Sequence, residues 1–160
     1  NVTQAIAVIG ALVLAGVYWG RRYWWAPSLT LLLGYLAEDS SQIILKLTVH
    51  RGHPPTTLGT WPSGGMGRLI LIYGLVLYFL IQRYRPESSR LWACGASVLA
   101  IAASVQAYAR INNLEHWLTD VAGGAIYGVL LLLVMVSAHA ALTRQAQRLD
   151  PRKQEIRALV

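Results

Sequence analysis

The apolar residues of this chain are gathered into blocks, and this grouping constrains the fold more than any other feature of the sequence. A helix needs roughly 20 consecutive apolar residues to cross a bilayer. Five blocks approach that length, and they cover residues 1–20, 26–45, 69–82, 91–109 and 121–142. Backbone groups inside lipid must be satisfied within the segment itself, which favours helices. The sequence therefore predicts an all-α fold, a polytopic transmembrane helix bundle with five spans in this chain.

The composition also favours a membrane domain. Hydrophobic residues make up 55% of the chain and charged residues 13%, whereas a soluble domain carries about 25% charged residues. The net charge of +7 could indicate a nucleic-acid partner, but in a membrane protein it more often reflects basic cytoplasmic loops. We therefore expect no nucleic acid. Residues 1–142 are assigned to a transmembrane domain and residues 143–160 to a basic cytoplasmic tail.

The basic side chains divide unevenly between the two sides of the predicted bundle. Ten belong to the first loop, the third loop and the tail: Arg21, Arg22, Arg83, Arg85, Arg90, Arg144, Arg148, Arg152, Lys153 and Arg157. Four belong to the other side: Lys46, Arg51, Arg68 and Arg110. The positive-inside rule places the larger group in the cytoplasm and the N-terminus outside. Because the smaller group lies close to polar motifs, we expect the second and fourth loops to converge on one extracytoplasmic site.

The clearest of these motifs precedes the last apolar block and contains Arg110, His116 and Asp120. Ionisable residues within membrane segments usually mark functional sites. In a helix, His116 and Asp120 share one face, so the carboxylate is expected to hydrogen-bond one ring nitrogen and leave the other as a nucleophile or base. Arg110 can supply a planar cation for phosphate. The alternative is a structural pair that closes a helix end.

Two further polar motifs are predicted on the same side, one at residues 46–55 and one at residues 61–65. The first supplies cations, and the second is a glycine-rich turn. Lys46 could equally be a residue that snorkels from the end of a span. Asp39, within the second apolar block, is expected either to pair with a basic residue beneath the site or to make a buried polar contact between helices.

With three motifs in this order, the chain resembles the type 2 phosphatidic acid phosphatase superfamily of membrane lipid phosphatases. The motifs of that family read Lys-x6-Arg-Pro, Pro-Ser-Gly-His and Ser-Arg-x5-His-x3-Asp. The matching positions are Lys46 and Pro54, then Pro62, Ser63 and Gly64, then Arg110, His116 and Asp120. Three positions depart from the motifs: His53 replaces an arginine, Gly65 a histidine and Ala109 a serine.

The resemblance implies a role for each matching side chain. His116 would attack phosphorus and form a phosphohistidine, and Asp120 would orient and polarise it. Lys46 and Arg110 would neutralise the phosphate oxygens. The implied phosphate cradle consists of Ser63, Gly64 and Gly65. Such a cradle is physically sensible, because helix N-termini bind anions. The family needs no metal and no other cofactor.

The histidine that Gly65 replaces is, by the resemblance, the general acid for the leaving group. Losing such an acid commonly costs a factor of about 10² to 10⁴. Three explanations stay open: His50 or His53 substitutes for it, the leaving group needs no proton, or the domain binds a phospholipid without hydrolysing it. Arg51 could likewise replace the arginine that is lost at His53.

The predicted function is hydrolysis of a lipid phosphate or diphosphate at the extracytoplasmic face, with a polyprenyl diphosphate favoured as substrate. The alternative is a non-catalytic relative that binds phospholipid or scaffolds an assembly. The predicted partners are membrane lipids and the lipid phosphate substrate, and a partner subunit or second copy stays open. The predicted location is the bacterial inner membrane. The family core usually has six spans, so a sixth either precedes Asn1 or is absent.

Overall fold

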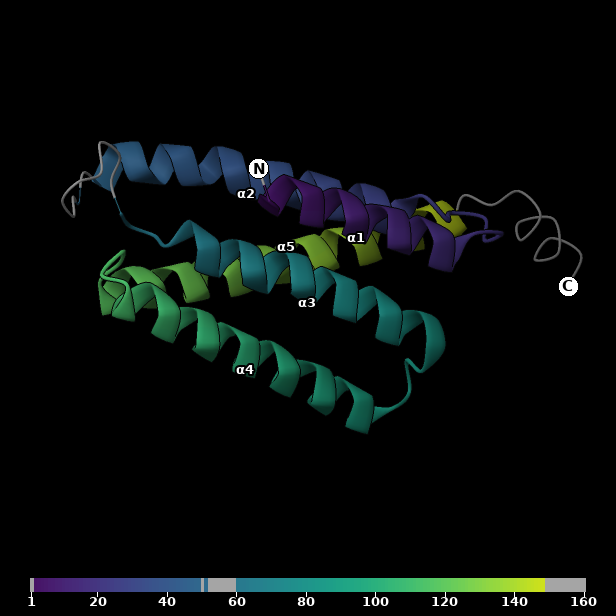
Figure 1. Ribbon diagram of the computed structural model, residues 1–160. Coiled ribbons are helices and arrows are strands. Elements are labelled where there is room, and N and C mark those ends of the chain that lie inside the picture. The colour runs from purple at the N-terminus through teal and green to yellow at the C-terminus, as the bar shows by residue number, and fades with distance from the viewer. Residues whose placement is uncertain (1, 50, 52–59, 149–160) are drawn as a thin grey trace, which may run out of the picture.

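The computed structural model describes residues 2–49, 51 and 60–148, and within these residues it contains five helices and no strand (Figure 1). The helices are α1 (Val2–Tyr18), α2 (Ala26–Val49), α3 (Gly64–Tyr84), α4 (Ser89–Asn112) and α5 (Leu118–Arg148). The predicted all-α class is confirmed. The residues from 149 onward, which form most of the predicted basic tail, lie outside the described residues.

Three of these helices are long and apolar enough to cross a membrane: 64–84, 89–112 and 118–146. The first helix contributes a shorter apolar stretch, Gln4–Tyr18. The second helix has 24 residues, but Glu38, Asp39 and Lys46 interrupt its apolar character. The prediction of five spans therefore stays a prediction.

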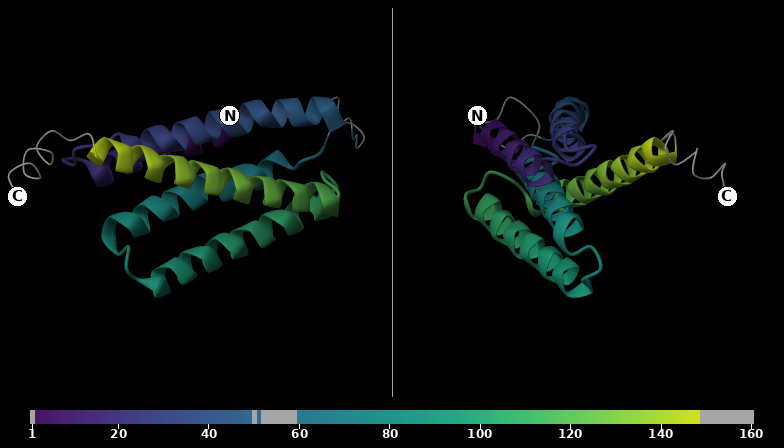
Figure 2. Two further views of the ribbon diagram at one scale, coloured as in Figure 1. Left: turned by 180° about the vertical axis from the view of Figure 1, so that it is seen from behind. Right: turned by 90° about the vertical axis from the view of Figure 1, so that its right-hand side faces the viewer.

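The third helix forms the centre of the bundle. It packs against each of the other four helices, and the end-on view in Figure 2 shows α1, α2, α4 and α5 arranged around it. Its buried side chains Leu71, Leu75 and Phe79 join Leu14 of α1 and Leu31 of α2 in the main hydrophobic cluster. None of the residues of α4 is buried, which suits a helix whose apolar side chains face lipid.

Glycines bring the beginnings of α3 and α5 into direct backbone contact. A Cβ at Gly124 would lie 2.4 Å from the carbonyl oxygen of Ser63, and a Cβ at Gly128 would lie 2.9 Å from that of Gly67. Only glycine permits such an approach, and small residues commonly mediate close packing between membrane helices. The close contact places the N-terminal ends of two helices side by side.

Both of these N-termini lie at the same end of the bundle as the C-terminal ends of α2 and α4 (Figure 1). The opposite end contains the α1–α2 turn, the α3–α4 turn and the end of α5. The described residues of the three polar motifs therefore share one end of the molecule, and the basic first and third loops share the other.

Candidate functional site

The second and third motifs are joined by a backbone hydrogen bond. The amide of Ser63, at the N-cap position of α3, donates to the carbonyl oxygen of Asp120 in the first turn of α5 at 2.9 Å. The glycine contact between the helices makes this approach possible. The start of α3 and the start of α5 are thus fixed to one another, and helix N-termini favour negative charge because their amide groups lack partners within the helix.

Asp120 lies at the centre of the site and is fully buried. Its Oδ2 atom accepts a hydrogen bond from the amide of Trp117 at 3.1 Å, which resembles the second half of a capping box. Its Oδ1 atom lies 3.8 Å from a guanidinium nitrogen of Arg51 and has no hydrogen-bond partner. A buried carboxylate requires neighbouring charge or donors, and the surroundings of Asp120 supply both.

His116 lies in the short connection between α4 and α5, and its side chain is only 12% exposed. Its Nδ1 atom is 3.7 Å from Oδ2 of Asp120, which is beyond hydrogen-bonding range, and it has no hydrogen-bond partner. The hydrogen bond expected from the sequence is therefore not formed, because the nearer carboxylate oxygen is turned to the amide of Trp117. The two side chains are nevertheless neighbours, although His116 precedes α5 and Asp120 lies within it.

The surroundings of this imidazole favour its neutral form. Burial lowers the pKa of His116 below its usual value, and the positive charge of Arg110 lowers it further. Asp120 acts in the opposite direction, and Lys46 adds a smaller lowering effect. A neutral imidazole keeps a nitrogen lone pair, which is the state that a nucleophile or base requires.

Arg110 occupies the space beside Gly65 that a side chain at that position would fill. A Cβ on Gly65 would lie 2.6 Å from a terminal nitrogen of the Arg110 guanidinium and 3.1 Å from its central carbon. The guanidinium also forms an ion pair with Glu115. Glycine at position 65, where the second motif has histidine, therefore leaves the space that Arg110 of the third motif occupies.

Unpartnered buried polar atoms gather at this end of the bundle. In the described part of the chain they belong to Ser63, His116, Asp120 and Gln42, and one further such atom belongs to Glu38, deeper in the bundle. Buried polar atoms nearly always have a hydrogen-bond partner, so a group of them beside two helix N-termini suits a site that receives a polar ligand.

Sequence reasoning missed Gln42 as a member of this group. Its amide is 2% exposed, and both amide atoms lack a partner. A Cβ on Gly64 would lie 2.8 Å from its Oε1 atom, so the amide packs against the first turn of α3. The signal in the sequence was the spacing of four residues between Gln42 and Lys46, which places both on one face of α2.

A partly buried ion cluster lies deeper in the bundle. Arg68 Nε donates to Glu38 Oε2 at 2.6 Å, and a terminal nitrogen of Arg68 donates to Asp39 Oδ1 at 2.5 Å. Glu38 is fully buried. This confirms the expected pairing of Asp39 with a basic residue, and it places Arg68 inside α3 as a partner of α2.

A cavity of about 420 Å³ opens beside the candidate site and runs along α3. Its polar end is formed by Gly65, Arg68 and Arg110, together with Gln106 of α4. Its apolar walls are formed by Ile6, Leu69, Ile72 and Tyr73. The cavity therefore brings cationic groups and apolar side chains together between α1, α3 and α4.

The remaining predicted residues are placed as follows. Lys46 is half-buried in the last turn of α2. The side chain of Arg51 is 44% exposed beside Asp120. His50 and His53 lie outside the described residues. Within residues 2–49, 51 and 60–148, no group of three or more His, Cys, Asp or Glu side chains could hold a metal ion.

Comparison with known proteins identifies the family. The family model described as the PAP2 superfamily matches residues 23–144, a range that contains all three motifs. The comparisons with curated proteins and with solved structures gave no match. The apolar helices and the family match indicate a membrane protein, and the family suggests phosphatase-type activity on lipid phosphates. Because one family model matches most of the sequence, the chain belongs to the PAP2 superfamily.

Proposed function

We propose that the protein hydrolyses a lipid phosphate or diphosphate through a phosphohistidine formed on His116. The observation that carries this proposal is the meeting of a neutral, buried imidazole, a buried carboxylate and the N-terminus of α3 at one end of the bundle. The pKa of His116 is lowered by burial and by Arg110, and the Ser63–Asp120 hydrogen bond fixes the cradle against the start of α5.

The reaction begins with attack of the Nε2 lone pair of His116 on phosphorus. Nδ1 faces the carboxylate of Asp120 at 3.7 Å, and a small rotation brings its proton into hydrogen-bonding range. Asp120 then stabilises the positive charge that develops on the ring. The bond between phosphorus and the leaving-group oxygen breaks, and that oxygen keeps the electron pair. Water subsequently attacks the phosphohistidine, which releases inorganic phosphate and restores the imidazole.

The phosphate oxygens are held by cations and by the start of α3. Arg110 can exchange its ion pair with Glu115 for a bidentate contact with phosphate, a geometry that suits a guanidinium. Ser63 is fully buried, and its hydroxyl has no partner in the structure, so it can serve the same phosphate. Lys46 adds a third group at the end of α2. The developing charge is thus met by donors that are already in position.

The cavity beside Gly65 and Arg110 supports a lipid as substrate. Its cationic end suits a phosphate and its apolar walls suit a hydrocarbon chain, and ligand sites are typically apolar with a few polar groups that fix orientation. Of the lipid phosphates, we favour a polyprenyl diphosphate. Its leaving group is itself a phosphate, which is a stable anion and has little need of the acid that is missing at Gly65.

The distribution of basic residues supports a site on the outer face of the membrane. The larger group of arginines and lysines belongs to the loops and the tail at the other end, and the positive-inside rule assigns that end to the cytoplasm. We place the protein in a bacterial inner membrane, with Lys46, Arg51 and Arg110 facing outward.

The test is phosphate release by the purified chain from lipid monophosphates and lipid diphosphates. His116→Ala is expected to abolish release, because it removes the proposed nucleophile. Asn113→Ala is a matched control in the same connection, since Asn113 is exposed and only its backbone caps α4. Full activity of His116→Ala on every substrate would contradict the proposal.

A second candidate function is phospholipid binding without hydrolysis. It is favoured by Gly65, because Arg110 fills the space where the general acid of the family would stand. In that case the wild-type protein is expected to bind lipid phosphates with an affinity that depends on Arg110, while no phosphate is released from either class of substrate.

A further inference from the structure

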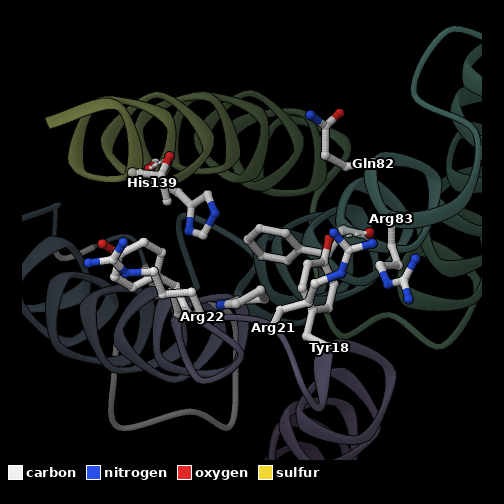
Figure 3. Close-up of a pocket in the computed structure, with 11 residues that line it drawn as sticks. Tyr18, Arg21, Arg22, Gln82, Arg83 and His139 are labelled. Atoms are coloured by element: carbon white, nitrogen blue, oxygen red, sulfur yellow. Dashed lines mark hydrogen bonds between the residues drawn. The ribbon is translucent and has the colours of Figure 1, made fainter. Parts of the chain in front are cut away.

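Two cavities of similar size lie at opposite ends of the bundle. One has a volume of about 400 Å³ and is lined by residues of α1, α2, α3, α5 and the α1–α2 turn, among them Tyr18, Gln82, Arg83 and His139 (Figure 3). None of its described lining residues belongs to the three motifs. The other is the cavity of about 420 Å³ beside Gly65, and it is the one that adjoins the candidate site.

The polar end of this second cavity has two successive layers. The outer layer contains Gly65 of α3 and Arg110 of α4, and the next layer contains Arg68 and Gln106. Along a helix, three residues span about 4.5 Å and four residues span about 6 Å. Because α3 and α4 run antiparallel (Figure 1), Arg68 and Gln106 both lie about one turn further into the bundle than the outer pair. Two layers at this spacing suit a headgroup with two consecutive polar units.

Beyond these two layers the lining becomes largely apolar. Ile72 and Tyr73 lie on the next turn of α3, and Ile6 of α1 lines the same cavity. A lining of this kind suits a hydrocarbon chain, since ligand sites are typically apolar with a few polar groups that fix orientation. A lipid diphosphate matches this order of polar and apolar groups. A prenyl monophosphate would leave the second polar layer without a polar partner.

Gln106 is an unusual residue for its position in α4. Residues 91–109 of this helix, which is long and apolar enough to cross a membrane, contain no charged side chain. Polar side chains within membrane segments are costly and usually have a function. Gln106 is half-buried, and its amide forms no hydrogen bond with any other residue that the structure describes. The two N–H donors of this amide are therefore available to a ligand in the cavity.

Arg68 supplies further donors to the same layer. A guanidinium has five N–H donors, and Arg68 uses two of them for Glu38 and Asp39, so others remain for the cavity that it lines. The two carboxylates balance its charge, so Arg68 contributes donors rather than net charge. The positive charge of the cavity comes from Arg110, whose partner Glu115 is exposed and can give way to a phosphate.

We propose that Gln106 and Arg68 form a subsite for the lipid-linked phosphate of a diphosphate substrate. This inference rests on the proposed function, in which His116 attacks phosphorus, here the terminal one. The bond between that phosphorus and the bridging oxygen breaks, and the bridging oxygen keeps the electron pair and stays on the lipid phosphate. Gln106 donates a hydrogen bond to this departing phosphate. Its developing negative charge is thereby stabilised without a proton donor at position 65.

The test compares Gln106→Met with the wild type on a prenyl diphosphate and on the matching prenyl monophosphate. Methionine keeps the length of the side chain but lacks the amide. A hydrogen bond to a charged group contributes about 10- to 100-fold, so kcat/KM for the diphosphate is expected to fall by that factor while kcat/KM for the monophosphate stays unchanged. Ser104→Ala is the matched control and is expected to change neither value. Its hydroxyl donates to the carbonyl of Ala100 within α4, and Ser104 does not line the cavity.

Two outcomes of this comparison would overturn the subsite while hydrolysis itself still stood. An equal fall in kcat/KM on both substrates would show that Gln106 serves the fold or the attacked phosphate. A fall on phosphatidic acid, with the prenyl diphosphate unaffected, would assign the amide to an ester carbonyl beside a single phosphate.

Binding measurements on variants that carry His116→Ala separate the subsite from the reaction. In this background, Gln106→Met is expected to weaken binding of the prenyl diphosphate by about 10-fold and to leave binding of the monophosphate unchanged. That result would support the subsite even if the wild type released no phosphate from any lipid, which would count against the proposed hydrolysis alone. Equal affinity for the diphosphate with and without the amide would overturn the subsite. Gln106→Leu gives the same comparison if the methionine variant does not fold.

Discussion

Gly65 offers the sharpest test of how this site handles a phosphate, because its missing side chain makes room for Arg110. In Gly65→Ala, the new methyl group would lie 2.6 Å from the guanidinium. Ordinary contacts between such atoms lie near about 3.5 Å, so the end of the arginine must move by roughly 1 Å. A displacement of that size at a reacting group can cost about 10²-fold in rate. We therefore expect kcat/KM to fall by about 10- to 100-fold, on lipid monophosphates and on diphosphates alike.

Gly65→His displaces Arg110 in the same way, but it also restores the acid that the family motif contains. Gly65→Ala is thus its matched steric control, and the informative quantity is the ratio of monoester to diphosphate kcat/KM. A monoester must expel an oxygen that needs a proton as its bond breaks, whereas a diphosphate expels a stable phosphate anion. Relative to Gly65→Ala, the histidine variant is expected to raise this ratio by about 10²-fold or more.

The assay is phosphate release from one lipid supplied as its monophosphate and as its diphosphate, under conditions where both are dispersed alike. An unchanged ratio between the two variants would refute the reasoning, since another group would then already supply the proton. An unchanged rate in Gly65→Ala would separately refute the assignment of Arg110 to the phosphate.

Three further predictions follow from the geometry. The pKa of His116 is lowered by burial and by Arg110 and raised by Asp120. As the pH is lowered, kcat/KM should therefore persist below the ordinary histidine pKa of about 6.5 before it falls. The Asp120→Asn variant should react more slowly, and its pH profile of kcat/KM should fall at a still lower pH. Gly124→Ala should destabilise the fold by about 1–3 kcal/mol through overpacking against Ser63, as thermal unfolding in detergent would show, whereas Gly16→Ala, with nothing within 4 Å of its Cβ, should be neutral or stabilising. Arg68→Ala should lower the free energy of unfolding by about 3–5 kcal/mol in the same assay, because it leaves the fully buried Glu38 unpaired. Asp39→Asn, at a side chain that is 42% exposed, should lower it much less.

The grouping of apolar residues into long blocks was sufficient to predict the fold class. The segment predicted at residues 26–45 forms the greater part of α2, and that at 91–109 forms the greater part of α4. The segment predicted at residues 69–82 was shorter than α3, which begins at Gly64 and includes Arg68. The charge of Arg68 marked an apparent boundary in the sequence, but the carboxylates of α2 neutralise it within the bundle.

The candidate site was less accessible to sequence reasoning than the fold. Linear spacing brought the side chains of His116 and Asp120 close together, because that relation is local, although His116 precedes α5 and does not share a helix face with Asp120. It could not reveal that the amide of Trp117 donates a hydrogen bond to the carboxylate oxygen of Asp120 that lies nearer to the imidazole. It also could not place Arg110 over Gly65, since these residues lie on different helices and meet only through the packing of α3 and α4. Gln42 was missed for the same reason, as its importance depends on its contact with Gly64.

Asp120 contributes to this site through two chemically separate parts. Its backbone carbonyl receives the amide of Ser63. Its side chain faces His116 and Arg51 and accepts a hydrogen bond from the amide of Trp117, a bond that the amide oxygen of an asparagine can also accept. A substitution of the carboxylate therefore leaves the joint between α3 and α5 in place. The structural role of the backbone carbonyl and the chemical role of the carboxylate can therefore be separated by mutation. A loss of turnover in Asp120→Asn can be attributed to the missing charge rather than to a displaced phosphate cradle.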